Sequence, residues 1–205
     1  MYSEQERLDI ISRLKKEANI LMQEKGVKKT TVDELVKRVG IPKGTFYLFY
    51  PSKEMLLFDV TQDFHEKVDA YLLQGCQKIF EEKHIVPSQE TDFSDCVEEF
   101  TDVILGAMEL TFSSCLRVVL EPEAMNLIIS KLPSELLEQH RKEDAGIGGN
   151  IFSMLAVRKG LKVEAVVGSF MMILFGGMYK EIVGESNRTD SMRYLIKGMV
   201  MQLIC

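Results

Sequence analysis

The residues best suited to chemistry lie near the N-terminus, in the segment GIPKGTFYLFYPSK at positions 40–53. Two glycines and a proline precede four aromatic side chains within five positions, and a second proline and a lysine follow. A tyrosine can bury its ring and offer its hydroxyl to a phosphate. Lys53, at the predicted start of a helix, joins free backbone amides in a site that favours anions. The segment therefore predicts contact with phosphate groups.

Patterns that indicate catalysis are absent from the rest of the sequence. The three histidines are scattered, and H-E-x-x-H, G-x-S-x-G and P-loop motifs do not occur. Four widely spaced cysteines form no C-x-x-C pair, which argues against a zinc site. We therefore predict that the chain is not an enzyme and uses neither a cofactor nor a metal.

Charge is distributed unevenly along the chain. The net charge is −6, yet residues 1–55 contain eleven basic and eight acidic side chains and so carry +3. The remainder consequently carries −9. A small basic segment on an acidic body favours an anionic partner for that segment alone, although a solvated helix face would give the same charges.

The chain is predicted to be cytoplasmic. Its first residues, MYSEQERLDII, are charged and lack the apolar core of a signal peptide. The longest apolar run, residues 165–179, falls short of the ~18 residues that indicate a membrane span. We therefore expect no membrane partner.

Helical periodicity dominates the sequence, so the predicted fold class is all-α, with about nine helices and no sheet. Thr31 and Glu34 form a predicted capping box, Gly40 ends the second helix, and Ser52 is a good N-cap for the fourth. We expect a three-helix domain at residues 1–52 and a larger helical domain at 53–205. The predicted helices span residues 4–25, 31–39, 43–50, 52–83, 92–114, 115–130, 133–158, 162–184 and 189–204.

Two of these helices are short and are joined by a turn that begins with Gly40, which is the pattern of a helix-turn-helix. The second short helix packs one face on its neighbours and presents the other to a DNA major groove. Gly44 has no side chain, so DNA can approach closely there, and Tyr47 lies near it on the helix. Because the predicted helix is short, its large aromatic side chains are needed to anchor it against the neighbouring helices.

The stretch TTVDELVKRVGIPKGTFYLFYPSKEMLL resembles the DNA-binding segment of the TetR/AcrR family of bacterial transcriptional repressors, a similarity that covers about residues 5–58. The order Phe49–Tyr50 departs from the family pattern and leaves open which ring is buried and which touches DNA. The position of Leu48 often varies in the family. The predicted DNA-binding residues are Thr31, Lys43, Gly44, Thr45, Tyr47, Leu48 and Lys53.

The resemblance implies that the remaining residues form a ligand-binding and dimerisation domain. Methionine and phenylalanine side chains suit an adaptable apolar pocket, although at helical spacing they are usually core. The predicted pocket residues are Phe100, Ile104, Met108, Phe112, Phe152, Met171 and Phe175. Two glycines and an apolar stripe near the C-terminus predict a four-helix dimer interface. Its predicted residues are Gly176, Gly177, Met192, Leu195, Ile196, Met199 and Leu203.

We therefore predict a ligand-responsive repressor that binds a palindromic operator in double-stranded DNA as a homodimer and responds to a small apolar effector. Activation instead of repression stays open. The alternative is a helical carrier of hydrophobic ligands, or a protein-interaction module, whose helix-turn-helix does not read DNA. The distinguishing feature is whether Lys28, Lys29, Lys43 and Lys53 share one face with Tyr47.

Overall fold

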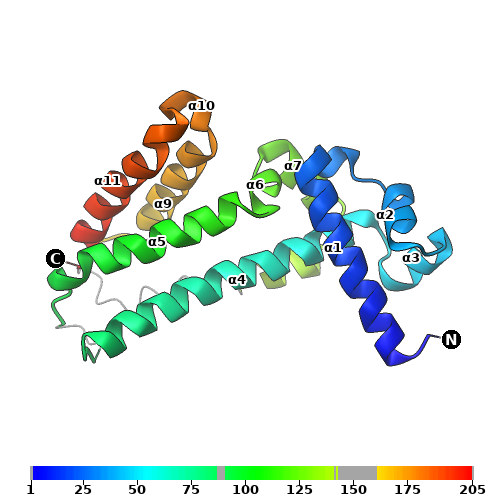
Figure 1. Cartoon of the computed structure of the whole chain (residues 1–205), viewed down its shortest axis with the longest axis horizontal. Helices are drawn as coiled ribbons and strands as arrows, with labels where there is room; N and C mark the ends of the chain where they lie inside the picture. Colours follow the sequence, from blue (N-terminus) through cyan, green and yellow to red (C-terminus); the bar gives the residue numbers. More distant parts are fainter. Residues whose placement is uncertain (1, 87–90, 141, 143–160, 205) are drawn as a thin grey trace. The chain divides into compact units, whose positions relative to one another are not determined.

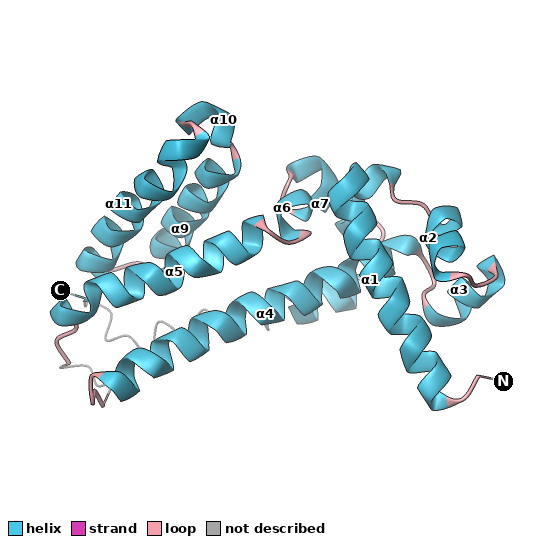
Figure 2. Cartoon of the chain, viewed as in Figure 1, coloured by secondary structure: helices cyan, strands magenta, loops and turns pink. Residues whose placement is uncertain are grey.

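The structure is a computed structural model that describes residues 2–86, 91–140, 142 and 161–204. All regular elements within these ranges are helical, which confirms the all-α fold (Figure 2). Residues 134–140 are also helical. In chain order, the elements are α1 (Glu4–Lys29), α2 (Val32–Val39), α3 (Lys43–Phe49), α4 (Lys53–Glu82), the 3-10 turn η1 (Ser94–Cys96), α5 (Val97–Phe112), α6 (Leu116–Val119), α7 (Pro122–Ile129), α9 (Val163–Met178), α10 (Lys180–Val183) and α11 (Glu185–Ile204) (Figure 1).

Glycine and proline set several of the helix ends. Gly40 adopts φ 74° at the end of α2, and Gly184 adopts φ 83° between α10 and α11. Both backbones lie in the left-handed region, which glycine adopts without steric cost. Gly26, at φ 79°, kinks α1 instead of ending it. Pro122 begins α7 and so divides the single helix predicted for residues 115–130.

The chain separates into two compact units. The first contains residues 1–67 and 111–140, and the second contains residues 68–110 and 141–205. Helix α4 contributes residues to both units, as does α5. The domain boundary predicted between residues 52 and 53 stays a prediction.

The core of the first unit forms around α1. Its inward face is fully buried at Leu14, Ala18 and Leu21, and these side chains belong to the same cluster as Phe46 of α3. Helices α2, α6 and α7 pack directly against α1. Because α1 supports α2, and α2 supports α3, the short third helix gains a rigid base.

The second unit combines an aromatic cluster with a helical pair. The rings of Phe80, Phe93 and Phe100 lie with centroids 5.8–6.2 Å apart and anchor the chain between α4 and α5. Helices α9 and α11 lie side by side and are joined by α10 (Figure 1). Among the described residues, none of the helices combines the length and apolarity needed to cross a bilayer.

Ion pairs fasten α11 to α5 within the second unit. Arg188 contacts Glu109 at 2.9 Å, and Arg193 contacts Asp102 at 2.6 Å. Lys197 pairs with Glu98 one turn further along α11. Single exposed ion pairs contribute little, but three along one helix define which side of α11 faces α5.

Candidate nucleic-acid interface

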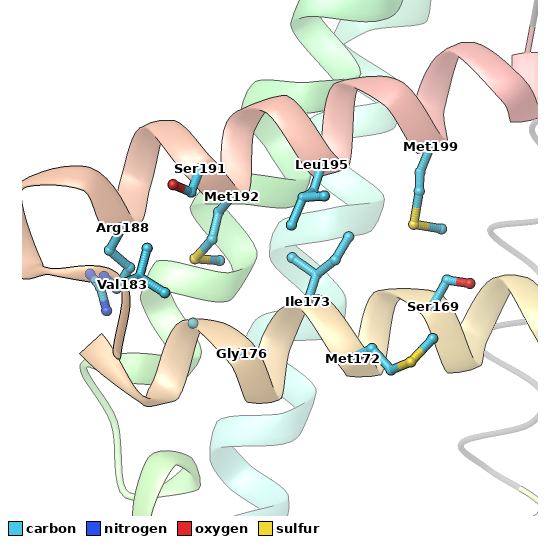
Figure 3. A pocket seen from close by; sticks show the side chains of 11 residues that line it. Ser169, Met172, Ile173, Gly176, Val183, Arg188, Ser191, Met192, Leu195 and Met199 are labelled. Carbon is cyan, nitrogen blue, oxygen red and sulfur yellow. The ribbon is translucent and has the colours of Figure 1, made fainter. Parts of the chain in front are cut away.

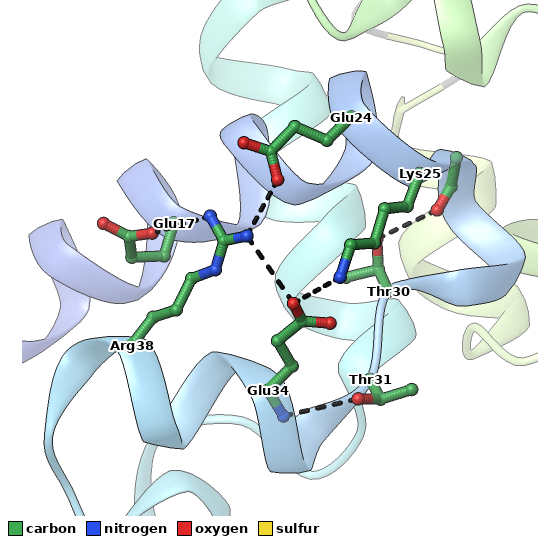
Figure 4. Close-up of polar contacts among 8 residues, drawn as sticks. Glu17, Glu24, Lys25, Thr30, Thr31, Glu34 and Arg38 are labelled. Carbon is green, nitrogen blue, oxygen red and sulfur yellow. Dashed lines mark hydrogen bonds and ion pairs between the residues drawn. The ribbon is translucent and has the colours of Figure 1, made fainter.

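Side-chain caps begin α2 and α4, whereas α3, which follows Pro42, has none. The amide of Glu34 donates to the hydroxyl of Thr31 at 3.3 Å, so half of the predicted capping box is present. The Glu34 carboxylate pairs with Lys25 and Arg38 (Figure 4). The amide of Met55 donates to Ser52 at 3.2 Å, which confirms Ser52 as the cap of α4.

Arg38 of α2 is the centre of an ion-pair network. Its guanidinium contacts Glu24 at 2.8 Å, Glu34 at 3.5 Å and Glu17 at 3.6 Å (Figure 4). These pairs raise the pKa of Arg38, mainly through the hydrogen bond to Glu24. Two of the three acids lie on α1, so the network fixes the angle between α1 and α2.

Helix α3 has one buried and one exposed face. Phe46 is fully buried, and its ring meets Tyr47 edge-on with centroids 5.2 Å apart. Tyr47 is 50% exposed and Leu48 is 66% exposed. A Cβ atom at Gly44 would meet no heavy atom within 4 Å. The predicted residues Gly44, Tyr47 and Leu48 therefore form an open outward face.

Thr45 does not share that face. It is only 7% exposed, and its hydroxyl lies 3.3 Å from the hydroxyl of Tyr2. Burial of the Thr45 side chain against the N-terminal segment argues against a direct contact with DNA. The predicted DNA contact of Thr45 stays a prediction. Thr31 is exposed, as the prediction requires.

The two rings that end α3 have different positions. Tyr50 is 8% exposed and donates its hydroxyl to the Asp59 carboxylate at 2.6 Å. Burial, together with Asp59, raises the pKa of Tyr50 well above its ordinary value. Phe49 is partly exposed, so Tyr50 is the buried ring of this pair.

The N-terminal residues also contact α3, which the sequence did not predict. The Tyr2 and Phe49 ring centroids lie 6.2 Å apart. The Arg7 guanidinium lies over the Phe49 ring, 5.1 Å from its centroid. Tyr2 also reaches Thr45. The sequence shows only an aromatic residue, Tyr2, beside the N-cap Ser3, and that pattern is not specific.

The basic side chains differ in their availability to a partner. Lys53 donates to the backbone carbonyls of Thr30 at 2.7 Å and Val27 at 3.2 Å. Lys43 pairs with Asp33 at 2.7 Å, and this hydrogen bond raises the pKa of Lys43. Between residues 25 and 53, all of which the structure describes, three exposed lysines make no ion pair. They are Lys28, Lys29 and Lys37.

A pocket of about 370 Å³ lies between α9 and α11 (Figure 3). Its lining is mainly apolar and includes five residues that were predicted for the dimer interface, namely Gly176, Gly177, Met192, Leu195 and Met199. The other two, Ile196 and Leu203, are buried inside the unit. Their role at an interface stays a prediction, and their burial argues against it.

The residues predicted for a ligand pocket do not line this cavity. Phe100, Met108 and Phe112 are buried, and Phe100 belongs to the aromatic cluster. Ile104 and Phe175 are partly exposed, and Met171 is exposed. Phe152 lies outside the described residues. Their role as a ligand site stays a prediction.

The fold and the outward face of α3 define a helix-turn-helix protein with a larger helical body. Residues 16–60 match the family model of bacterial regulatory proteins of the tetR family. The uncharacterized HTH-type transcriptional regulator YuxN of Bacillus subtilis (strain 168) is 37% identical over 70 residues. That match covers 34% of this chain and only 22% of YuxN.

Solved structures share the whole fold at low identity. A transcriptional regulator FadR from Bacillus subtilis, in complex with stearoyl-CoA, is 15% identical with a TM-score of 0.60, and the match covers 93% of this chain and 98% of FadR. RolR in complex with resorcinol is 17% identical with a TM-score of 0.56, and the match covers 96% and 90% of the two chains. The match at residues 16–60 and the shared fold support a regulator of the TetR family.

Proposed function

We propose that this chain is a DNA-binding repressor that binds a palindromic operator as a homodimer and is released by a small apolar ligand. The observation that carries the proposal is the exposed face of α3, with Gly44, Tyr47 and Leu48 side by side on a helix whose opposite face is buried. A rigid helix that offers an open face at a helix-turn-helix suits a major groove.

The proposed phosphate contacts come from the exposed lysines near α2. Lys28, Lys29 and Lys37 are free to meet an anion, whereas Lys43 must first leave Asp33. Each phosphate contact releases counterions and adds about 0.9 to the slope of binding against salt. Lys53 contacts backbone carbonyls, so a phosphate contact from it requires that these bonds open or be shared.

The proposed partner in the dimer is a second copy of the chain, seated on α9 and α11. Met172 is 71% exposed and Leu195 is 57% exposed, and both line the apolar pocket between the two helices. An apolar surface of this kind favours a protein partner. Two helices from each copy would form a four-helix bundle about a twofold axis, which also suits a palindromic site.

The proposed effector is a small molecule with apolar character. Structures of the same fold contain resorcinol in RolR and stearoyl-CoA in FadR, so the fold accommodates both an aromatic ring and an acyl chain. For this chain, the ligand and its site are proposals.

Helix α4 is the proposed connection between ligand and DNA. It contains 30 residues and so spans about 45 Å. A ligand that tilts it would change the spacing of two reading helices that must match half-sites ~34 Å apart. A ~100-fold preference for the state that does not bind DNA supplies about 2.7 kcal/mol. Calorimetric titration of an identified ligand into free and operator-bound protein should show this same ratio, and equal affinities would exclude the mechanism.

The proposed setting is the cytoplasm, and the proposed role is regulation without catalysis. Within the described ranges, groups of three or more histidine, cysteine, aspartate or glutamate side chains arranged for a metal ion do not occur. The absence of enzymatic activity and of a cofactor stays a prediction.

Selection of bound sequences from random DNA tests the proposal. The full-length chain should enrich a twofold-symmetric sequence, and a cell extract that contains the effector should reduce the yield. A chain that is dimeric and binds an apolar ligand, yet enriches no sequence, would support the carrier alternative and contradict the DNA-binding function.

A further inference from the structure

We propose that this protein recognises its DNA site chiefly through thymine methyl groups, and that Leu48 is the residue that reads one of them. The inference rests on the proposed DNA-binding function and specifies the chemistry of its target sequence. It follows from which side chains of α3 are exposed and from which side chains α3 lacks.

The outward face of α3 is apolar at its centre. Leu48 is 66% exposed, whereas Thr45 and Phe46, which precede it in the same helix, are buried. A single exposed leucine is common on protein surfaces and means little by itself. Here it lies four positions after Gly44, so both lie on the same side of the helix. The empty space at Gly44 allows a close approach, which brings the Leu48 side chain within reach of base edges.

The remaining groups of α3 offer few hydrogen bonds to bases. Asparagine, glutamine, arginine and lysine form paired hydrogen bonds with adenine or guanine, and of these the sequence KGTFYLF contains a single lysine, Lys43. Thr45 is turned inward, and Lys43 pairs with Asp33. Tyr47 is left with one hydroxyl. Hydrogen bonds from α3 therefore carry little sequence information.

The major-groove edge of DNA presents one apolar group, the C5-methyl of thymine. An exposed aliphatic side chain distinguishes bases by burying that methyl. Burial of one such carbon changes affinity by about fourfold. The half-site should accordingly contain a thymine opposite Leu48, and removal of its methyl should weaken binding by that factor.

The experiment replaces each thymine of the selected operator in turn by deoxyuridine, which removes only the methyl group. Wild-type protein should lose about three- to fivefold in affinity at one position of each half-site. Leu48→Ala should bind the thymine operator more weakly and should be insensitive to deoxyuridine at that position. Because Leu48 is exposed, circular dichroism should show an unchanged fold for the variant.

A second variant gives a positive readout. Leu48→Gln supplies the amide that pairs with adenine, so it should shift the preference at the same position from thymine towards adenine. Deoxyuridine that is tolerated by wild-type protein at every position, or equal sensitivity in wild type and Leu48→Ala, would overturn the inference and leave DNA binding intact. Failure to select any sequence would overturn both the inference and the proposed function.

Discussion

At the scale of single residues, the lysines of the helix-turn-helix have two kinds of role. Lys53 bonds to backbone carbonyls where α1 ends, and Lys29 is exposed and makes no ion pair within the described residues. A cation at a helix C-terminus is stabilising, because it complements the partial negative charge of the unpaired carbonyls. The two lysines should therefore respond differently to the same substitution.

We expect Lys53→Ala to lower the free energy of unfolding by about 1–2 kcal/mol, because hydrogen bonds from a charged group to two carbonyls are lost. Lys29→Ala should leave stability unchanged and flatten the salt slope of DNA binding by about 0.9. Chemical denaturation and binding titrations at several salt concentrations measure both. Unchanged stability in Lys53→Ala would contradict its structural role.

Tyr50 should make stability depend on alkaline pH. Burial and Asp59 raise its pKa, so the folded protein keeps the phenol protonated where the unfolded chain ionises, near pH 10. The contribution of Tyr50 is therefore present below pH 10 and is lost as pH rises above that value.

We expect wild-type protein to lose stability above pH 10 more steeply than Tyr50→Phe, by up to about 1.4 kcal/mol per pH unit. At neutral pH the variant should be less stable by about 1 kcal/mol, because the bond to Asp59 is lost. Urea denaturation between pH 7 and 11 measures both effects. Tyr47→Phe is the control, since Tyr47 is half exposed. Identical pH slopes for wild type and Tyr50→Phe would refute the account.

At the scale of elements, α4 and α5 approach closely at two glycines in the second unit. A Cβ atom at Gly75 would lie 2.6 Å from a methyl of Val103, and one at Gly106 would lie 2.2 Å from the Tyr71 hydroxyl. The side chains that an added Cβ atom would meet differ in how easily they can move. Valine is stiff about χ1, whereas Tyr71 is 44% exposed and can turn towards solvent.

We expect Gly75→Ala to be less stable than Gly106→Ala by at least about 1 kcal/mol. Each alanine gains about 1 kcal/mol of helix propensity, but only the first forces a rigid neighbour to move, at about 1–3 kcal/mol. Thermal denaturation of both variants gives the comparison. A larger loss in Gly106→Ala would show that Tyr71 is held in place.

Helices could be predicted from the sequence where local chemistry decides. The helix end at Gly40, the cap at Ser52 and the apolar spacing of α1 each depend on residues only a few positions apart. The sequence could therefore predict the helix-turn-helix, which the structure confirms. The contacts of individual side chains depend on residues that are distant in the sequence. Lys53 bonds to carbonyls 23 and 26 residues earlier, and Tyr2 meets Thr45, 43 residues later. Spacing within one helix contains no signal for such contacts.

The sequence also could not distinguish residues that line a cavity from residues that fill a core. Phe100 and Met108 occur at helical spacing, which is the same whether a side chain lines a cavity or fills a core. In the structure both are buried, and Phe100 packs against Phe80 and Phe93. The apolar pocket formed where the interface residues were expected, between α9 and α11.

At the scale of the whole molecule, assembly should depend on the exposed side chains of α9 and α11. We expect wild-type protein to sediment as a dimer and Leu195→Glu to sediment as a monomer, because the new charge would be buried against the second copy. Gln202→Glu adds the same charge to α11 outside the pocket lining and should stay dimeric. A dimeric Leu195→Glu would place the interface elsewhere.

If the outward face of α3 reads DNA, as we propose, Gly44→Val should abolish recognition of the operator. A Cβ atom added at Gly44 meets no heavy atom within 4 Å, so the fold should stay intact while the close approach to DNA is blocked. The measurement is an equilibrium titration of wild type and variant with the selected operator and with a scrambled duplex. We expect wild-type protein to prefer the operator by about 1,000-fold or more, and a folded, dimeric Gly44→Val to lose this preference. Equal wild-type affinity for both duplexes, or an undiminished preference in the variant, would contradict this proposal.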